Sequence, residues 1–165
     1  MTALLRSRRV RVAAACLAHL VLVGVAVAPQ LSARLTGDEL RLAVAPLDPI
    51  DPFRGAYVVL DYPDLPLRQE SKELPAPLRG EVFIPLEQEG ELWEGGDVTA
   101  EEPSSGRYLR CDTDGWQVRC GIESLFASQD EALRIEQQLA SGAVAVVRVD
   151  GSGNAAVVRV EAARP

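Results

Sequence analysis

The sequence is poor in the residues that carry most enzymatic chemistry. Of its 165 residues, one is histidine, three are cysteine and only 5% are aromatic. Lys72 is the single lysine, and it lies in a proline-rich stretch with no serine on a defined elbow. Because His19 sits inside an apolar run, a Ser-His-Asp triad is effectively excluded. There is also no Cys-x-x-Cys motif and no phosphate-binding glycine loop after a predicted strand, so we expect neither a cofactor nor a metal.

Positive charge is scarce outside the N-terminus. The net charge is −7, but four of the 17 basic residues precede the apolar run: Arg6, Arg8, Arg9 and Arg11. The rest of the chain carries 13 basic against 24 acidic residues. Such an acidic domain repels phosphate backbones, which argues against a nucleic-acid partner. Solubility is the plainest explanation of the acidity.

The one long hydrophobic run, residues 12–28, predicts a transmembrane helix. Its 17 residues would span roughly 25 Å as a helix, close to a bilayer core of about 30 Å. The basic cluster before it places the N-terminus in the cytoplasm. We therefore expect a single-pass membrane protein. Residues 1–29 would form the basic stub and anchor, and the C-terminal domain would lie outside the cytoplasm.

A cleaved signal peptide is the competing interpretation of this run. Ala26 and Ala28 resemble a cleavage site, but Pro29 would follow the scissile bond and make a poor peptidase substrate. The uncleaved anchor is the interpretation we favour. His19 is then a tolerated polar side chain or a contact between helices, since the span holds no acidic partner for a proton relay.

The rest of the chain predicts a mainly β domain over residues 39–165, preceded by a linker over residues 30–38. Leu40, Leu42 and Val44 alternate with polar or small residues, the pattern of a half-buried strand. Three hairpins follow, with turns at Glu89-Gly90, Asp114-Gly115 and residues 150–154. Together they predict an antiparallel sheet or small open barrel of about seven or eight strands, with one covering helix.

That covering helix is predicted over residues 128–142. Ser128 followed by Glu131 forms a capping box, and Gly142 provides the stop. Leu133 and Leu139, with Ile135 or Ala132, supply apolar positions for its buried face.

Two cysteines, Cys111 and Cys120, flank the second hairpin. A compartment outside the inner membrane is oxidising, so they can pair there. If Asp114-Gly115 is a two-residue turn, however, they lie diagonally on one face, near the limit of disulfide geometry. The sequence leaves both the bridged and the reduced form open.

Two segments of the exported part resemble the GDYXXLXY family of bacterial proteins. The first is residues 55–62, Gly-Ala-Tyr-Val-Val-Leu-Asp-Tyr, preceded by an Asp-Pro-rich lead-in; the second is residues 120–126, Cys-Gly-Ile-Glu-Ser-Leu-Phe. Order and spacing match over nearly the whole exported part. The resemblance implies an N-terminal membrane segment, a domain without an established activity and a polytopic membrane partner. The motif residues are Asp48, Asp51, Arg54, Gly55, Tyr57, Leu60, Tyr62, Gly121, Glu123 and Phe126.

This chain departs from the family pattern at three points. Ala56 replaces the Asp of the motif, Cys120 stands where the family tends to have Tyr, and the Glu that usually follows the Phe is missing. If the acidic groups serve a shared activity, this member is expected to lack it.

The residues around the first segment allow several interpretations. Asp48, Asp51 and Arg54 favour a rigid corner, because Asp-Pro steps form turns, but they could also dock a partner. With Asp61, the two aspartates could bind a hard cation, although no ligand spacing is defined. Tyr57 and Tyr62 face opposite sides of the predicted strand, so one is expected in the core and one at the surface. Glu123 and Glu136 are candidate charge partners for Arg54.

We therefore expect an accessory module that binds or stabilises a polytopic membrane protein. One alternative is a hydrolase using the carboxylates of Asp48, Asp51 and Glu123, or an inactive relative of one. The other is a periplasmic ligand-binding or sensing module.

Overall fold

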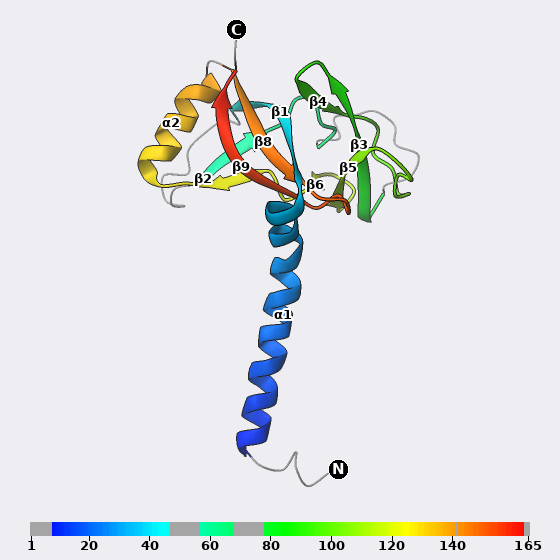
Figure 1. Cartoon of the computed structure of the whole chain (residues 1–165), viewed down its shortest axis with the longest axis vertical. Coiled ribbons are helices and arrows are strands. Elements are labelled where there is room, and N and C mark those ends of the chain that lie inside the picture. Colours follow the sequence, from blue (N-terminus) through cyan, green and yellow to red (C-terminus); the bar gives the residue numbers. More distant parts are fainter. Residues whose placement is uncertain (1–7, 47–56, 68–77, 141, 164–165) are drawn as a thin grey trace.

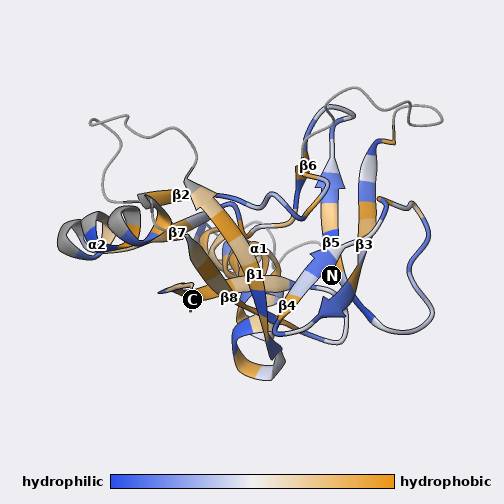
Figure 2. Cartoon of the chain, turned by 90° about the horizontal axis from the view of Figure 1, so that it is seen from above, coloured by the Kyte–Doolittle hydropathy of each residue, from blue (hydrophilic) through white to orange (hydrophobic). Residues whose placement is uncertain are grey.

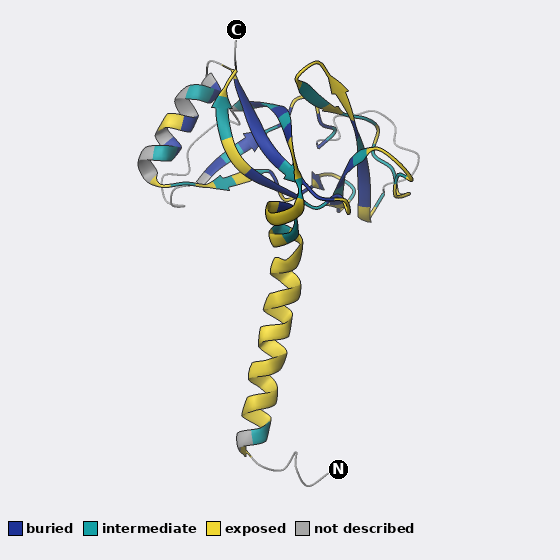
Figure 3. Cartoon of the chain, viewed as in Figure 1, coloured by how far each residue is buried: buried dark blue, intermediate teal, exposed yellow. Residues whose placement is uncertain are grey.

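The chain folds into one long helix that carries a β domain at its upper end (Figure 1). The structure, a computed structural model, describes residues 8–46, 57–67, 78–140 and 142–163. The helix α1 (Arg8–Thr36) is long and apolar enough over Val10–Thr36 to cross a membrane. Figure 3 shows it exposed along nearly its whole length until it reaches the domain.

The segment predicted as a linker is helical up to Thr36 and packs on the domain. Ala33 is fully buried, and the Ser32 hydroxyl donates to the carboxylate of Asp150 at 2.5 Å. The Arg148 guanidinium donates to the Arg34 carbonyl at 2.7 Å. The last turns of α1 are therefore fixed to the domain by both packing and hydrogen bonds.

A five-stranded antiparallel sheet forms one half of the domain, in the order β7-β2-β1-β8-β9. Its central strand β1 buries Leu40, Leu42 and Val44, which confirms the predicted alternation. Figure 2 shows hydrophobic colouring over much of β1. The strands are β1 (Asp38–Pro46), β2 (Tyr57–Asp61), β7 (Ser124–Phe126), β8 (Ala143–Val149) and β9 (Ala155–Ala162).

A second, four-stranded sheet has the order β4-β3-β5-β6. It contains β3 (Gly80–Glu89), β4 (Leu92–Gly95), β5 (Arg107–Thr113) and β6 (Val118–Arg119). Because Glu89 pairs with Leu92, the first hairpin turns at Gly90-Glu91, one residue later than predicted. Within the described residues there are thus nine strands, slightly more than the sequence predicted, because β6 and β7 have two and three residues.

Both sheets and the helix α2 (Gln129–Ala140) contribute to one hydrophobic core. Ile84 and Leu109 enter it from the second sheet and Val147 from the first, all fully buried. The covering helix adds Ala132, Ile135 and Leu139, and the Ser128 hydroxyl caps it by accepting from the Glu131 amide at 3.4 Å. The mainly β class with an N-terminal apolar helix and one covering helix is confirmed.

The second hairpin turns differently from the prediction, with a consequence for the cysteines. Thr113 pairs with Val118, so the loop has four residues, 114–117, instead of the predicted two. The Asp114 carboxylate accepts hydrogen bonds from the backbone of Trp116 and Gln117, which stabilises the wider loop. This shift in register places Cys111 opposite Cys120, and they form a disulfide with their Cα atoms 4.1 Å apart. The predicted diagonal arrangement is wrong because the turn was predicted too short.

Candidate functional site

The two segments that carry the family resemblance lie side by side. Strand β2 pairs with β7 in antiparallel register, so that Tyr57 lies opposite Phe126 and Val59 opposite Ser124. The Leu60 amide continues this ladder by donating to the Glu123 carbonyl at 2.9 Å. We call residues 57–62 and 120–126 together the junction. Segments about 60 residues apart in sequence thus form one structural unit.

Tyr62 joins the two halves of the junction from inside the core. Its side chain is 2% exposed, and its hydroxyl donates to the Ile122 carbonyl at 2.8 Å. Burial, with a smaller effect of the nearby Glu123 charge, raises the pKa of Tyr62 far above its ordinary value. The hydroxyl therefore stays protonated and acts as a hydrogen-bond donor. Tyr62 is therefore a core residue, while the side chain of Tyr57 lies outside the described part of the chain.

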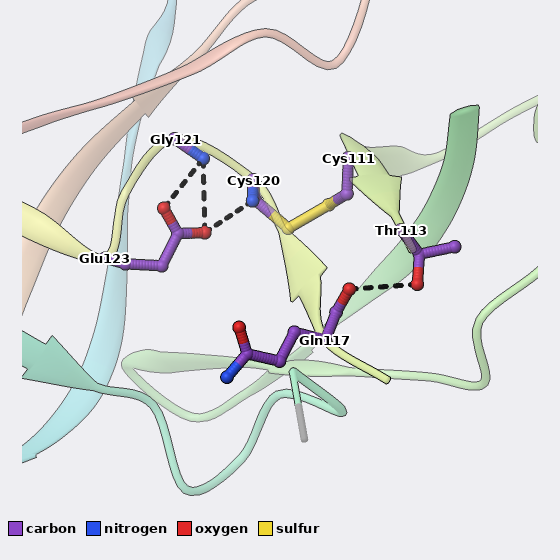
Figure 4. The surroundings of a disulfide bond; sticks show 6 residues. All are labelled: Cys111, Thr113, Gln117, Cys120, Gly121 and Glu123. Atoms are coloured by element: carbon purple, nitrogen blue, oxygen red, sulfur yellow. Dashed lines mark hydrogen bonds between the residues drawn. A yellow bond between two sulfur atoms is a disulfide. The ribbon is translucent and has the colours of Figure 1, made fainter. Parts of the chain in front are cut away.

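Glu123 holds the turn of the junction in place (Figure 4). Its carboxylate accepts from the Cys120 amide at 2.5 Å and from the Gly121 amide at 3.1 Å. Gly121 has a backbone φ of +78°, which residues with a side chain rarely adopt. The turn therefore favours glycine at this position. The carboxylate of Glu123 is thus engaged by backbone N–H groups that would otherwise lack partners.

The disulfide anchors the same turn to the second sheet. Cys111 belongs to β5, and both cysteines are nearly buried, at 4% and 6% exposed. Figure 4 shows that the disulfide joins the turn at Cys120, the residue whose backbone amide donates a hydrogen bond to Glu123. In the neighbouring β5–β6 loop, the Thr113 hydroxyl donates to the Gln117 carbonyl at 2.9 Å and stabilises that loop. The turn is therefore held from both sheets.

The junction also contacts the long helix. The Gln30 side chain of α1 donates to the Gly121 carbonyl at 3.3 Å. In Figure 1 the yellow segment that carries β7 lies along the lower margin of the domain, level with the upper end of α1. The junction thus lies at the end of the domain from which the apolar helix extends.

A shallow pocket opens beside the junction. Its volume is about 240 Å³, below the roughly 300 Å³ at the lower end for drug-sized ligands. Three of its lining residues are charged: Asp61, Arg119 and Glu123. Glu123 is engaged by the turn, Arg119 pairs with Asp114 at 3.2 Å, and Asp61 also interacts within the chain, so all three charges have intramolecular partners. The remaining lining residues are Val59, Leu60, Leu67, Gln117 and Val118.

Two aromatic side chains of the described residues stand out on the surface of the β domain. Phe126 ends the junction and is 85% exposed, and Trp116 in the β5–β6 loop is 80% exposed. Exposed aromatic residues are favoured in protein interfaces. Phe126 is the one that belongs to a family segment.

Several predicted site residues lie outside the described part of the chain. These are Asp48, Asp51, Arg54 and Gly55, together with Ala56, and the side chains of Tyr57 and Glu136. The catalytic, cation-binding and corner hypotheses that depend on them stay predictions. Among the described residues, no three His, Cys, Asp or Glu side chains are grouped so that they could hold a metal ion.

Sequence reasoning missed the residues that fix α1 to the domain. Asp150 was predicted only as part of a turn, yet it is 6% exposed and accepts from Ser32, Ser152 and Asn154. Burial by itself would raise its pKa, but these hydrogen bonds together hold the pKa of Asp150 below its ordinary value. The only signal in the sequence is an aspartate that directly follows a mostly apolar strand.

Comparison with known proteins gives one match. The family model described as GDYXXLXY protein matches residues 19–160, most of the chain. No curated protein matches the chain, and no solved structure matches it.

Proposed function

The chain belongs to the GDYXXLXY family, and on that premise we propose that it is a membrane-anchored accessory module that binds a polytopic membrane protein through the junction. In this proposal α1 crosses the bacterial inner membrane once, with the basic N-terminus in the cytoplasm and the β domain outside. The partner would contact the junction and its exposed Phe126, close to the membrane.

One observation carries the proposal: the family residues of the junction have structural partners. Tyr62 donates to Ile122, Glu123 accepts from two backbone amides, and Gly121 accepts from Gln30 of the helix. A general acid or base must reach substrate with its polar atoms, whereas these atoms stabilise a turn. The side chain that the junction presents outward is Phe126, which suits docking.

The pocket beside Glu123 supports a second candidate, a small-ligand or sensing module. It places an apolar floor beside Asp61 and Arg119. Its small volume and the engagement of Glu123 favour the docking proposal over ligand binding.

The topology can be tested by protease digestion of spheroplasts. External protease should cut the β domain of the full-length chain and leave the N-terminal epitope intact, because only the domain lies outside. A cytoplasmic protein serves as the control for lysis. Protection of the domain in intact spheroplasts would overturn the proposed orientation.

Partner binding can be tested by purifying the tagged full-length chain from its native membranes in mild detergent. We expect one multi-span membrane protein to co-purify in stoichiometric amount and to be identified by mass spectrometry. A tagged α1 lacking the β domain is the control, since it removes the junction. Repeated purification of the chain alone would contradict the proposed function.

A further inference from the structure

His19 lies near the middle of the apolar length of α1. The helix around it consists of aliphatic, alanine and glycine residues and Cys16, and His19 is exposed on its surface. Within the described residues, no hydrogen bond or ion pair is made by its ring. In a bilayer such a group is costly and usually faces protein, where another side chain can hydrogen-bond to it.

Helix geometry places His19 on roughly the same side of α1 as Gln30 and Ala33, two of the residues that contact the domain. With about 100° of rotation per residue, Gln30 lies about 20° from His19 around the helix axis and roughly 16 Å further along it. Ala33, which is fully buried against the domain, is about 40° away on the other side. His19 thus lies on the side of α1 on which Gln30, further along the helix, contacts the Gly121 turn.

The docking of α1 fixes this direction. Ser32 is bonded to Asp150, Arg148 to the Arg34 carbonyl, and the Arg34 guanidinium donates to the Val157 carbonyl at 3.4 Å. Rotation of the helix relative to the domain would break all three contacts. His19 therefore lies on the same side of α1 as Gln30, which contacts the junction.

We propose that a transmembrane helix of the partner packs on the His19 face of α1 and presents a hydrogen-bonding side chain to the imidazole. This face comprises Ala15, His19, Val23 and Ala26. The proposal rests on the proposed function and extends the docking surface from the junction into the membrane. Ala15 and Ala26, within about 40° of His19, allow the close helix approach that interhelical hydrogen bonds require.

A second copy of this chain does not suit this face. Packed helices lie about 8–10 Å apart, and the β domain occupies the space above the His19 face, where Gln30 and Ala33 contact it. Two parallel copies joined here would bring both domains into the same space. A polytopic protein with short external loops can instead lie beneath the domain.

Cross-linking around α1 in native membranes tests the proposal. A photoreactive amino acid is placed in the full-length chain at Ala15, Val23 or Ala26, and on the opposite face at Leu17, Val21 or Ala28. We expect an adduct of one mass, with a multi-span protein, from the first three positions only. Adducts from all faces, or from the opposite face alone, would overturn the proposal. So would an adduct of twice the mass of this chain.

His19 variants test the hydrogen bond itself. His19→Leu should weaken partner binding in detergent by about 3- to 20-fold, the range for an interhelical hydrogen bond, while His19→Gln should restore most of it. Leu17→Ala on the opposite face is the matched control and should bind normally. Equal partner binding by His19→Leu and the wild-type protein would overturn the role of His19. If wild-type chain recovers the partner but the scan shows no preferred face, only this inference fails; if no partner is recovered, the proposed function fails as well.

Discussion

Replacing both Cys111 and Cys120 with serine should lower the free energy of unfolding by about 2–5 kcal/mol. The bridge closes the β5–β6 hairpin and joins the junction to the second sheet, with both cysteines nearly buried. Without it, the unfolded chain gains conformational freedom and two hydroxyls enter the core. Denaturant titration of the full-length protein in mild detergent, followed by tryptophan fluorescence, measures the change.

Cys16 provides the matched control for this experiment. It is the one free cysteine, exposed on α1, so Cys16→Ser should leave unfolding unchanged. A reducing agent should destabilise wild-type protein and Cys16→Ser by the same amount, and should have no effect on the double variant. Equal stability of wild-type protein with and without reductant would contradict a structural role for the disulfide.

Gly37→Ala should separate α1 from the domain. A Cβ atom at Gly37 would lie 2.4 Å from the Ala33 carbonyl oxygen and 2.9 Å from the Val149 backbone nitrogen. Both are backbone atoms of packed elements, so relief requires the helix or strand β8 to shift. Overpacking of this kind costs about 1–3 kcal/mol. Hydrogen exchange of the β8–β9 turn, which Ser32 contacts through Asp150, should increase in the variant.

Gly24→Ala is the control for this substitution, because nothing lies within 4 Å of a Cβ atom at Gly24. It adds the same methyl group within α1, away from the domain. If the two variants show the same rate of amide hydrogen exchange at the β8–β9 turn, the helix is not docked as described.

The sequence predicted the fold class and missed the registers. Alternating Leu40, Leu42 and Val44 define β1 because burial on one face requires a period of two. By contrast, the β5–β6 loop depends on Asp114 accepting two backbone amides, which a two-residue turn signal does not reveal. Strand β7 has three residues, too few for any periodicity to show.

The sequence indicated the two segments that form the junction, but not how they pair. The two family segments were recognised from their motifs, but their pairing through Leu60 and Tyr62 is a tertiary contact between segments far apart in sequence. Glu123 was a candidate charge partner of Arg54, which lies outside the described residues; the structure shows that Glu123 accepts from the backbone of its own turn, which the sequence did not indicate. Contacts such as Gln30 with Gly121 join a predicted linker to a loop, and no local pattern indicates them.

The most direct test of the docking account compares two exposed aromatic residues. Phe126→Ala removes an 85% exposed ring from the junction, and Trp116→Ala removes an 80% exposed ring from the neighbouring hairpin loop. Both variants should fold, because neither ring is buried. An interface anchor contributes enough that its loss weakens binding about tenfold or more.

Quantitative co-purification of the multi-span partner from native membranes therefore decides the matter. The docking account predicts that Phe126→Ala loses most of the partner while Trp116→Ala retains it at the wild-type level. Equal recovery by the two variants, or loss with Trp116→Ala alone, would contradict the assignment of the junction as the docking site.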